Sequence, residues 1–133
     1  MNPQEYAEAL NLEKYNHDLR KYGVRAIDYL VRESLRCATE HGFTEATPAE
    51  DIALMHSELS EALEELRGNR KPSSLYFNED KPLKPEGVPA ELADVLIRVF
   101  HFAGKHNIDL AEAVARKMLY NESRPFKHGG KVL

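Results

Sequence analysis

Cysteine is nearly absent from this chain of 133 residues, in which Cys37 is the single thiol. One cysteine excludes a disulfide within the chain and any zinc site built on several thiolates, and we expect Cys37 to be a small buried residue on a helix. Long hydrophobic runs are lacking too, since none approaches the roughly 20 apolar residues that span a bilayer. The amino terminus, MNPQEYAEALNLEKY, is polar and has no apolar core of the signal-peptide kind, so we expect a cytoplasmic location.

Positive charge is also in deficit. Lys and Arg number 18 against 22 Asp and Glu, a formal net charge of -4, so the chain has no broad basic footprint and we expect no nucleic-acid partner. Charged residues make up 30% and apolar residues 42% of the chain, which is ordinary for a globular protein. Because a chain of this length can bury one proper core, we predict a single domain over residues 1–133. The lack of long apolar runs leads us to expect no membrane partner.

Strand-like alternation is absent as well, and this predicts an all-α fold, a bundle of four to five helices. Helix formers and apolar spacing place the helices at about residues 4–21, 24–41, 48–67, 89–105 and 109–121. The expected end signals are Gly23 and Gly42, and the expected start signals are Thr47-Pro48 and an Asp109–Glu112 capping box. We expect residues 1–22 to be peripheral, residues 68–89, which hold four of the seven prolines, to form a loop, and residues 122–133 to form a basic tail.

Two of these predicted helices each carry a pair of acids three residues apart. Glu58 and Glu61 lie in MHSELSEALEELR, and Glu91 and Asp94 lie in ELADVLIRVFH. Positions three apart share one side of a helix, so two such helices side by side would point four carboxylates at one another. In the predicted helix over residues 48–67, Glu58 and Glu61 border an apolar stripe that we expect to be part of the core. This stripe is formed by Ile52, Met55, Leu59, Leu63 and Leu66.

Several interpretations of these acids remain open. Each pair could be a solvated helix face, or it could pair with a basic side chain, for which Arg98 beside Asp94 is the best placed. Buried carboxylates without partners are costly, and a hard divalent cation relieves their repulsion, so oxygen-only ligands favour Mg²⁺, with Mn²⁺ as a substitute. A di-iron bundle needs Glu-x-x-His on two helices, and none of the six histidines has a Glu three residues before it. We expect His101 to be structural.

Residues 54–133 resemble the MazG-type, all-α nucleoside triphosphate pyrophosphohydrolases. Their signature is E-E-x-x-E followed after a spacer by E-x-x-D; here the first half begins with Ser57 in place of the leading Glu, and Glu91-Leu92-Ala93-Asp94 matches the second. The ending KMLYNESRPFKHGGKVL resembles the K-x-x-x-N-x-x-R-P-x-x-H-G-G-K ending of the small MazG-like branch, common in phages and bacteria.

The resemblance implies metal-dependent hydrolysis of a nucleoside or deoxynucleoside triphosphate to the monophosphate and pyrophosphate, for nucleotide-pool control. It implies Mg²⁺ or Mn²⁺ on Glu58, Glu61, Glu91 and Asp94, and self-association as a dimer or tetramer. We expect Glu61 to act as the general base, because it lies near the edge of the first acid cluster. Phe43 is expected at the base, and the expected phosphate-binding residues are Lys117, Asn121, Arg124 and Lys131. The alternative from another class is a non-catalytic, metal-stabilised helical bundle that binds nucleotide or a partner protein.

Overall fold

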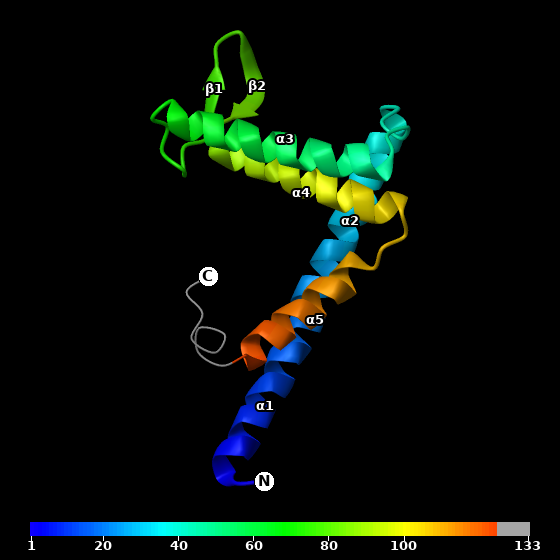
Figure 1. The fold of residues 1–133 in the computed structure, drawn as a ribbon, viewed down its shortest axis with the longest axis vertical. Coiled ribbons are helices and arrows are strands. Elements are labelled where there is room, and N and C mark those ends of the chain that lie inside the picture. Colours follow the sequence, from blue (N-terminus) through cyan, green and yellow to red (C-terminus); the bar gives the residue numbers. More distant parts are fainter. Residues whose placement is uncertain (125–133) are drawn as a thin grey trace. The chain divides into compact units, whose positions relative to one another are not determined.

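The computed structural model describes residues 1–124, and most of them are helical. In chain order the elements are α1 (Pro3–Asp18), the π-helix η1 (Leu19–Val24), α2 (Arg25–Glu40), α3 (Pro48–Arg67), β1 (Tyr76–Asn78), β2 (Lys81–Glu86), α4 (Val88–Lys105) and α5 (Leu110–Ser123) (Figure 1). The prediction of a mostly helical fold is confirmed. The chain forms two compact units: one holds residues 1–29 and the chain from Asp109 onward, and the other holds Leu30–Ile108.

Local capping chemistry explains where the helices begin. Asn2 and Glu5 form a reciprocal capping box ahead of α1, with Pro3 as its first residue. At α3 the Thr47 hydroxyl accepts a hydrogen bond from the Glu50 backbone N–H at 3.2 Å, as the sequence predicts. Among residues 1–124, no helix has the length and apolar character that crossing a bilayer requires.

Three helices end on a residue with positive φ. Gly42, Asn69 and Asn107 have φ of 80°, 62° and 54° after α2, α3 and α4. After α2 the Phe43 N–H donates to the Ala38 carbonyl at 2.8 Å, and Gly42 donates to the carbonyl of Thr39. The same pair of bonds closes the other two helices, which is the Schellman arrangement. The predicted end at Gly42 and the predicted end of the third helix at about residue 67 are therefore confirmed.

Gly23 does not break the helix, so that prediction is wrong. The helical backbone passes from Asp18 to Arg25 through η1, and both flanking residues have right-handed helical dihedrals. Glycine inside a helix costs only about 1 kcal/mol relative to alanine, which tertiary contacts can outweigh. The irregularity appears instead as one turn of π-helix, a form that often marks an inserted residue in an α-helix.

The prediction that residues 68–89 form a loop is wrong in part, because they contain an antiparallel hairpin. β1 pairs with β2 through Tyr76–Glu86, Phe77–Pro85 and Asn78–Lys81, with an irregular step after Phe77. Proline is compatible with an edge strand that has no further neighbour, which is why the prolines of β2 conceal the strand in the sequence. Gly87, with φ of 106°, then joins β2 directly to α4.

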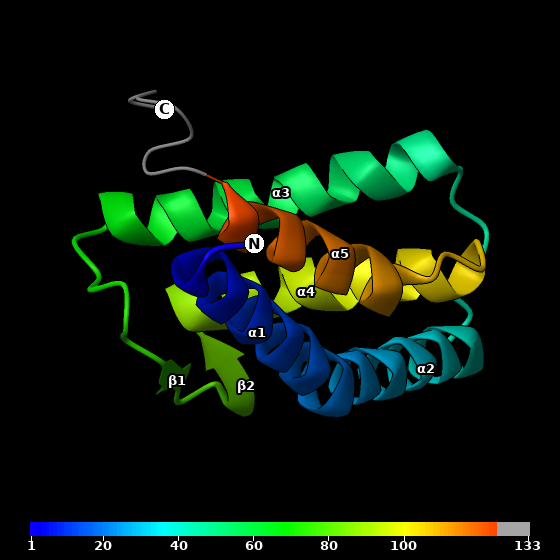
Figure 2. The ribbon, with the colours of Figure 1, turned by 90° about the horizontal axis from the view of Figure 1, so that it is seen from below.

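The Leu30–Ile108 unit is built on α3 and α4, which lie side by side in opposite directions (Figures 1 and 2). Its buried apolar residues are small: Ala62 of α3 with Val88, Ala90 and Ala103 of α4. At Gly104 a Cβ would lie 3.0 Å from the Leu35 Cβ, so α2 also approaches α4 closely here.

The predicted core stripe of α3 is wrong for most of its residues. Four of its five members are 42–50% exposed: Ile52, Leu59, Leu63 and Leu66. Three apolar residues of α4 are exposed to a similar degree, 46–54%: Leu92, Leu96 and Ile97. Buried instead between the helices are two acids, Glu58 and Glu91. Helical periodicity shows which residues share a face, but small residues decide where two helices approach, and here they lie beside the acids.

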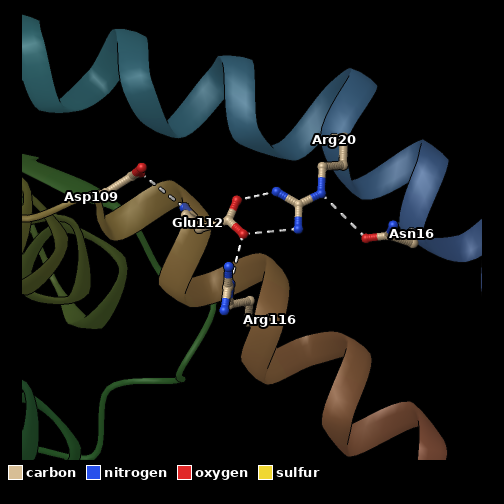
Figure 3. Close-up of polar contacts among 5 residues, drawn as sticks. All are labelled: Asn16, Arg20, Asp109, Glu112 and Arg116. Carbon is tan, nitrogen blue, oxygen red and sulfur yellow. Dashed lines mark hydrogen bonds and ion pairs between the residues drawn. The ribbon is translucent and has the colours of Figure 1, made fainter.

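The other unit packs α1 and η1 against α5 (Figure 3). Arg20 of η1 forms a two-pronged ion pair with Glu112 of α5, which also accepts a hydrogen bond from Arg116 at 2.8 Å. These two arginines hold the pKa of Glu112 down, at about 2. Asp109 caps α5 as predicted, through the Glu112 N–H at 3.1 Å. The expected return bond from the Glu112 carboxylate is replaced by the two arginines.

Candidate metal centre

Three of the four predicted ligands converge between α3 and α4. One carboxylate oxygen each from Glu58, Glu61 and Glu91 lies within 4.8 Å of the other two. Glu58 and Glu61 are one turn apart on α3, and Glu91 lies in the first turn of α4. The helical spacing of the acids and the antiparallel packing of the two helices together produce the cluster.

Burial makes this cluster electrostatically costly. Glu58 is 8% exposed and Glu91 is 9% exposed. Burial, followed by the proximity of Glu61 and Glu58, raises the pKa of Glu91 from 4.5 to about 7. The Oε2 atom of Glu91 is buried and has no hydrogen-bond partner among residues 1–124. Such an atom is normally satisfied by protein, water or an ion, so the centre has an unmet need for a proton or a cation.

Asp94, the fourth predicted ligand, lies next to this cluster but is not one of the three converging residues. It is exposed on α4, one turn after Glu91. Partial desolvation of its carboxylate by neighbouring protein atoms and the nearby negative charge of Glu58 raise the pKa of Asp94, while Arg98 opposes the rise. Asp94 therefore shares the field of the acidic cluster.

Arg98 does not pair with Asp94 in the way the sequence suggests. Its Nε donates to the Glu58 Oε1 at 2.8 Å, across from α4 to α3. Glu58 is the more buried of the two acids, so a cation gains more by pairing there. This bond supplies positive charge to one side of the centre.

A second group of acids adjoins the first, and this group was not predicted from the sequence. One oxygen each from Glu65, Glu86 and Glu91 lies within 4.8 Å of the other two. The Tyr76 hydroxyl donates to both oxygens of Glu65, at 3.0 and 2.9 Å, and the Lys84 ammonium lies 3.1 Å from Glu86. Glu65 lies two turns after Glu58 on α3, so helical spacing could have placed it near the cluster. Glu86 depends on a hairpin that is not evident from the sequence.

A cavity of about 900 Å³ in the same unit has Glu58, Asp94 and Arg98 in its wall. Its far side is formed by the end of α2 and the connection to α3, including Phe43, which is 71% exposed. The remaining lining residues that matter here are Cys37, His41, Asp51 and His101. Ligand cavities in proteins usually measure about 300–1,000 Å³, so this one has the size of a small-molecule site.

Two residues that line this cavity, Cys37 and His101, have surroundings that were not predicted from the sequence. Cys37 is exposed rather than buried, because α2 turns that side of the helix toward the cavity. His101, expected to be structural, has a buried Nε2 without a hydrogen-bond partner in the described part of the chain. Burial lowers the pKa of His101, which favours the neutral ring. Nearby, Lys105 bridges the Asp51 carboxylate at 3.1 Å and the Ala46 carbonyl at 2.6 Å.

The predicted phosphate-binding residues lie in the other unit or outside the described residues. Lys117, Asn121 and Arg124 fall in and just after α5. The Lys117 ammonium and the Arg124 guanidinium lie 5.7 and 5.5 Å from the centre of the Tyr120 ring, and the backbone carbonyl of Asn121 accepts from Arg124. Lys131 lies outside the described residues.

Comparisons with family models, with curated proteins and with solved structures find no match to this chain. The resemblance to MazG-type enzymes therefore rests on the motif residues alone. The class that the fold and the centre define is a mostly helical protein with a carboxylate cluster between two antiparallel helices.

Proposed function

We propose that this protein is a MazG-like, metal-dependent hydrolase that converts a nucleoside or deoxynucleoside triphosphate to its monophosphate and pyrophosphate. The observation that carries the proposal is the convergence of Glu58, Glu61 and Glu91 within 4.8 Å, beside a cavity that Glu58 and Asp94 line. These residues are the ones that match the two halves of the pyrophosphohydrolase signature.

The residues of the centre fit a hard divalent cation. All the donors are carboxylates, the ligand type that Mg²⁺ and Mn²⁺ prefer, and the orphaned Oε2 of Glu91 has no donor to satisfy it among residues 1–124. A cation held by Glu58, Glu61, Glu91 and Asp94 would neutralise phosphate charge and increase the acidity of a bound water. The pKa of Glu91, raised to about 7 without a cation, makes such binding weaker in acid.

The triphosphate would enter through the cavity beside the acids. Phe43, largely exposed in its wall, offers a face on which a base can stack. Arg98 donates to Glu58 at 2.8 Å from the same wall. If Glu58 held a cation, the Arg98 guanidinium would be available to bind a phosphate oxygen. Lys117, Asn121, Arg124 and Lys131 remain proposed phosphate-binding residues on the resemblance alone.

The chemistry is the addition of water to the α-phosphorus. The water oxygen bonds to phosphorus, the bond from that phosphorus to the oxygen bridging the α- and β-phosphates breaks, and pyrophosphate leaves with the bridging oxygen. Glu61 is proposed to accept the proton of the water, because it is the exposed member of the cluster and lies within 4.8 Å of both buried acids.

Self-association into a dimer or tetramer is part of the proposal. Five leucines of α3 and α4 (Leu59, Leu63, Leu66, Leu92 and Leu96) are 42–54% exposed, and burial of such residues against another subunit would be favourable. A second copy of the chain packed on these leucines would bury them at the subunit interface.

The test is product analysis with eight ribo- and deoxynucleoside triphosphates, each with Mg²⁺ and with a chelator. We expect a monophosphate and pyrophosphate only in the presence of the metal, and the preferred base names the substrate. Glu61→Gln should lower turnover at least about 100-fold with an unchanged circular dichroism spectrum. Glu64→Gln is the matched control, because Glu64 is 67% exposed on the same helix and pairs with the surface residue Arg67.

Full activity in Glu61→Gln would contradict the assignment of this residue as the base. Metal-dependent stabilisation without turnover of any triphosphate would instead favour the alternative, a non-catalytic bundle that needs the cation to fold.

A further inference from the structure

We propose that Lys105 is a positioning residue, which holds the segment that carries Phe43 against the end of α4 and so sets the affinity for the base without touching the substrate. This inference rests on the proposed function for the cavity, and in particular on Phe43 as the face on which the base stacks. Lys105 lies outside both halves of the motif and outside the basic ending of the chain.

Lys105 is the last residue of α4, where a lysine commonly binds the free carbonyls of its own helix. Its ammonium reaches two other segments instead. It donates to the Ala46 carbonyl, in the connection between α2 and α3, at 2.6 Å, and to the Asp51 carboxylate, in the first turn of α3, at 3.1 Å. The two partners are 59 and 54 residues away in the sequence. In both views the connection between α2 and α3 passes the end of α4 (Figures 1 and 2).

The two bonds of Lys105 are largely shielded from water. The Lys105 side chain is 16% exposed and that of Asp51 is 13% exposed. A buried ion pair adds little net stability compared with apolar packing, but removal of one partner leaves the other charge buried and uncompensated. The pair therefore acts mainly on geometry, since it joins the connection and the start of α3 to α4 at one fixed place.

Both partners of Lys105 belong to the wall of the cavity, whereas Lys105 itself is not among its lining residues in the described part of the chain. Phe43 comes three residues before Ala46. The Phe43 N–H donates to the Ala38 carbonyl at 2.8 Å, which ties the near end of this short stretch to α2, and Lys105 ties its far end to α4. A side chain that does not line the cavity thus fixes the wall in which Phe43 lies.

A role in stability alone predicts different kinetics. Loss of stability lowers the fraction of folded enzyme, so the apparent kcat falls and KM stays the same. A displaced stacking face weakens the binding of substrate and transition state equally, so KM rises and kcat stays the same.

The first experiment measures kcat and KM for Lys105→Met, which removes the ammonium and keeps an apolar stem. We expect KM to rise about tenfold and kcat to stay within about twofold of the wild type. Lys105→Arg, which keeps a charged donor, should recover the affinity in part. Lys81→Met is the matched control, an exposed lysine of β2 in the same unit, and should leave both constants unchanged. If circular dichroism shows that Lys105→Met does not fold, the double variant Asp51→Asn/Lys105→Gln takes its place, because it removes both charges together and its glutamine is one bond shorter than lysine.

The second experiment needs no turnover. The chain has no tryptophan, so Phe43→Trp places a single fluorescent reporter on the wall. Time-resolved anisotropy without nucleotide should show larger local motion of this tryptophan when Lys105→Met is added. Its quenching by the α,β-methylene analogues of the four common deoxynucleoside triphosphates, with Mg²⁺, should then need about tenfold more analogue.

An unchanged KM in the Lys105 variant, or a lower kcat with the same KM, would overturn the positioning role. Equal motion of the tryptophan with and without Lys105 would overturn it as well. If no triphosphate is hydrolysed but an analogue binds more weakly to the variant, the proposed hydrolysis fails and the positioning role stands. If nothing is hydrolysed and no analogue binds, both proposals fail.

Discussion

Replacement of Glu91 by glutamine should stabilise the metal-free protein while abolishing its response to metal. Glutamine keeps the shape of the side chain but removes a negative charge that lies near Glu58, Glu61 and Asp94. The charge is costly in the folded state because the carboxylate is 9% exposed and its Oε2 is unpartnered among the described residues.

The magnitude follows from the pKa of Glu91. A rise from 4.5 to about 7 corresponds to at most about 3 kcal/mol, at 1.36 kcal/mol for each tenfold change in proton affinity. Water that reaches the exposed Glu61 and Asp94 screens part of this energy. Because the folded state binds the proton more tightly than the unfolded chain, wild-type stability is highest in acid and falls as the pH rises from about 4.5 to about 7. We therefore expect Glu91→Gln to gain about 1–3 kcal/mol at about pH 8 and nothing at about pH 4.

The assay is urea unfolding followed by far-ultraviolet circular dichroism, with a chelator and at both pH values. Repeating it with Mg²⁺ at about 100 times its dissociation constant should stabilise the wild type by about 2.7 kcal/mol and leave Glu91→Gln unchanged. Equal or lower stability of Glu91→Gln at the higher pH would refute the reasoning, because the charge of Glu91 would then carry no cost. Glu64→Gln, an exposed change on α3, should be neutral throughout.

Three further predictions concern other parts of the chain. Gly87→Ala should lower the free energy of unfolding by more than about 2 kcal/mol, because φ is 106° and the new Cβ would meet the Ser74 carbonyl; an urea midpoint close to that of the wild type would contradict this. Arg20 and Arg116 hold the pKa of Glu112 at about 2, so Glu112 should contribute stability that is complete above about pH 4.5 and lost toward pH 2. In Glu112→Gln, melting curves should show a smaller loss of stability in acid. A pH profile of stability equal to that of the wild type would count against the ion pair. His101→Phe should raise the unfolding free energy by about 1 kcal/mol, since it removes a buried nitrogen without a partner, and a loss of that size would show that the nitrogen is satisfied.

Features set by local chemistry were predictable from the sequence. The Thr47 cap and the Gly42 stop depend on residues within one turn of each other, and both are found as expected. The meeting of Glu58, Glu61 and Glu91 was also predictable, because helical spacing fixes each pair and neighbouring helices in a chain usually pack side by side.

Features set by distant contacts were not predictable. Arg98 bonds to Glu58, forty residues away, rather than to its helix neighbour Asp94. Glu86 reaches the centre through a hairpin whose prolines resemble a loop in the sequence. The outward direction of the leucines on α3 depends on which face of the helix meets α4, and periodicity alone gives the stripe without its orientation.

The exposed position of Cys37 makes it a natural reporter of what enters the cavity. It is the single cysteine of the chain and lies in the wall that also contains Glu58 and Arg98. A fluorinated or fluorescent thiol reagent would therefore attach at one known position without any engineered cysteine. Its signal would follow nucleotide and cation binding separately, and its rate of attachment would measure how far a bound nucleotide shields that wall.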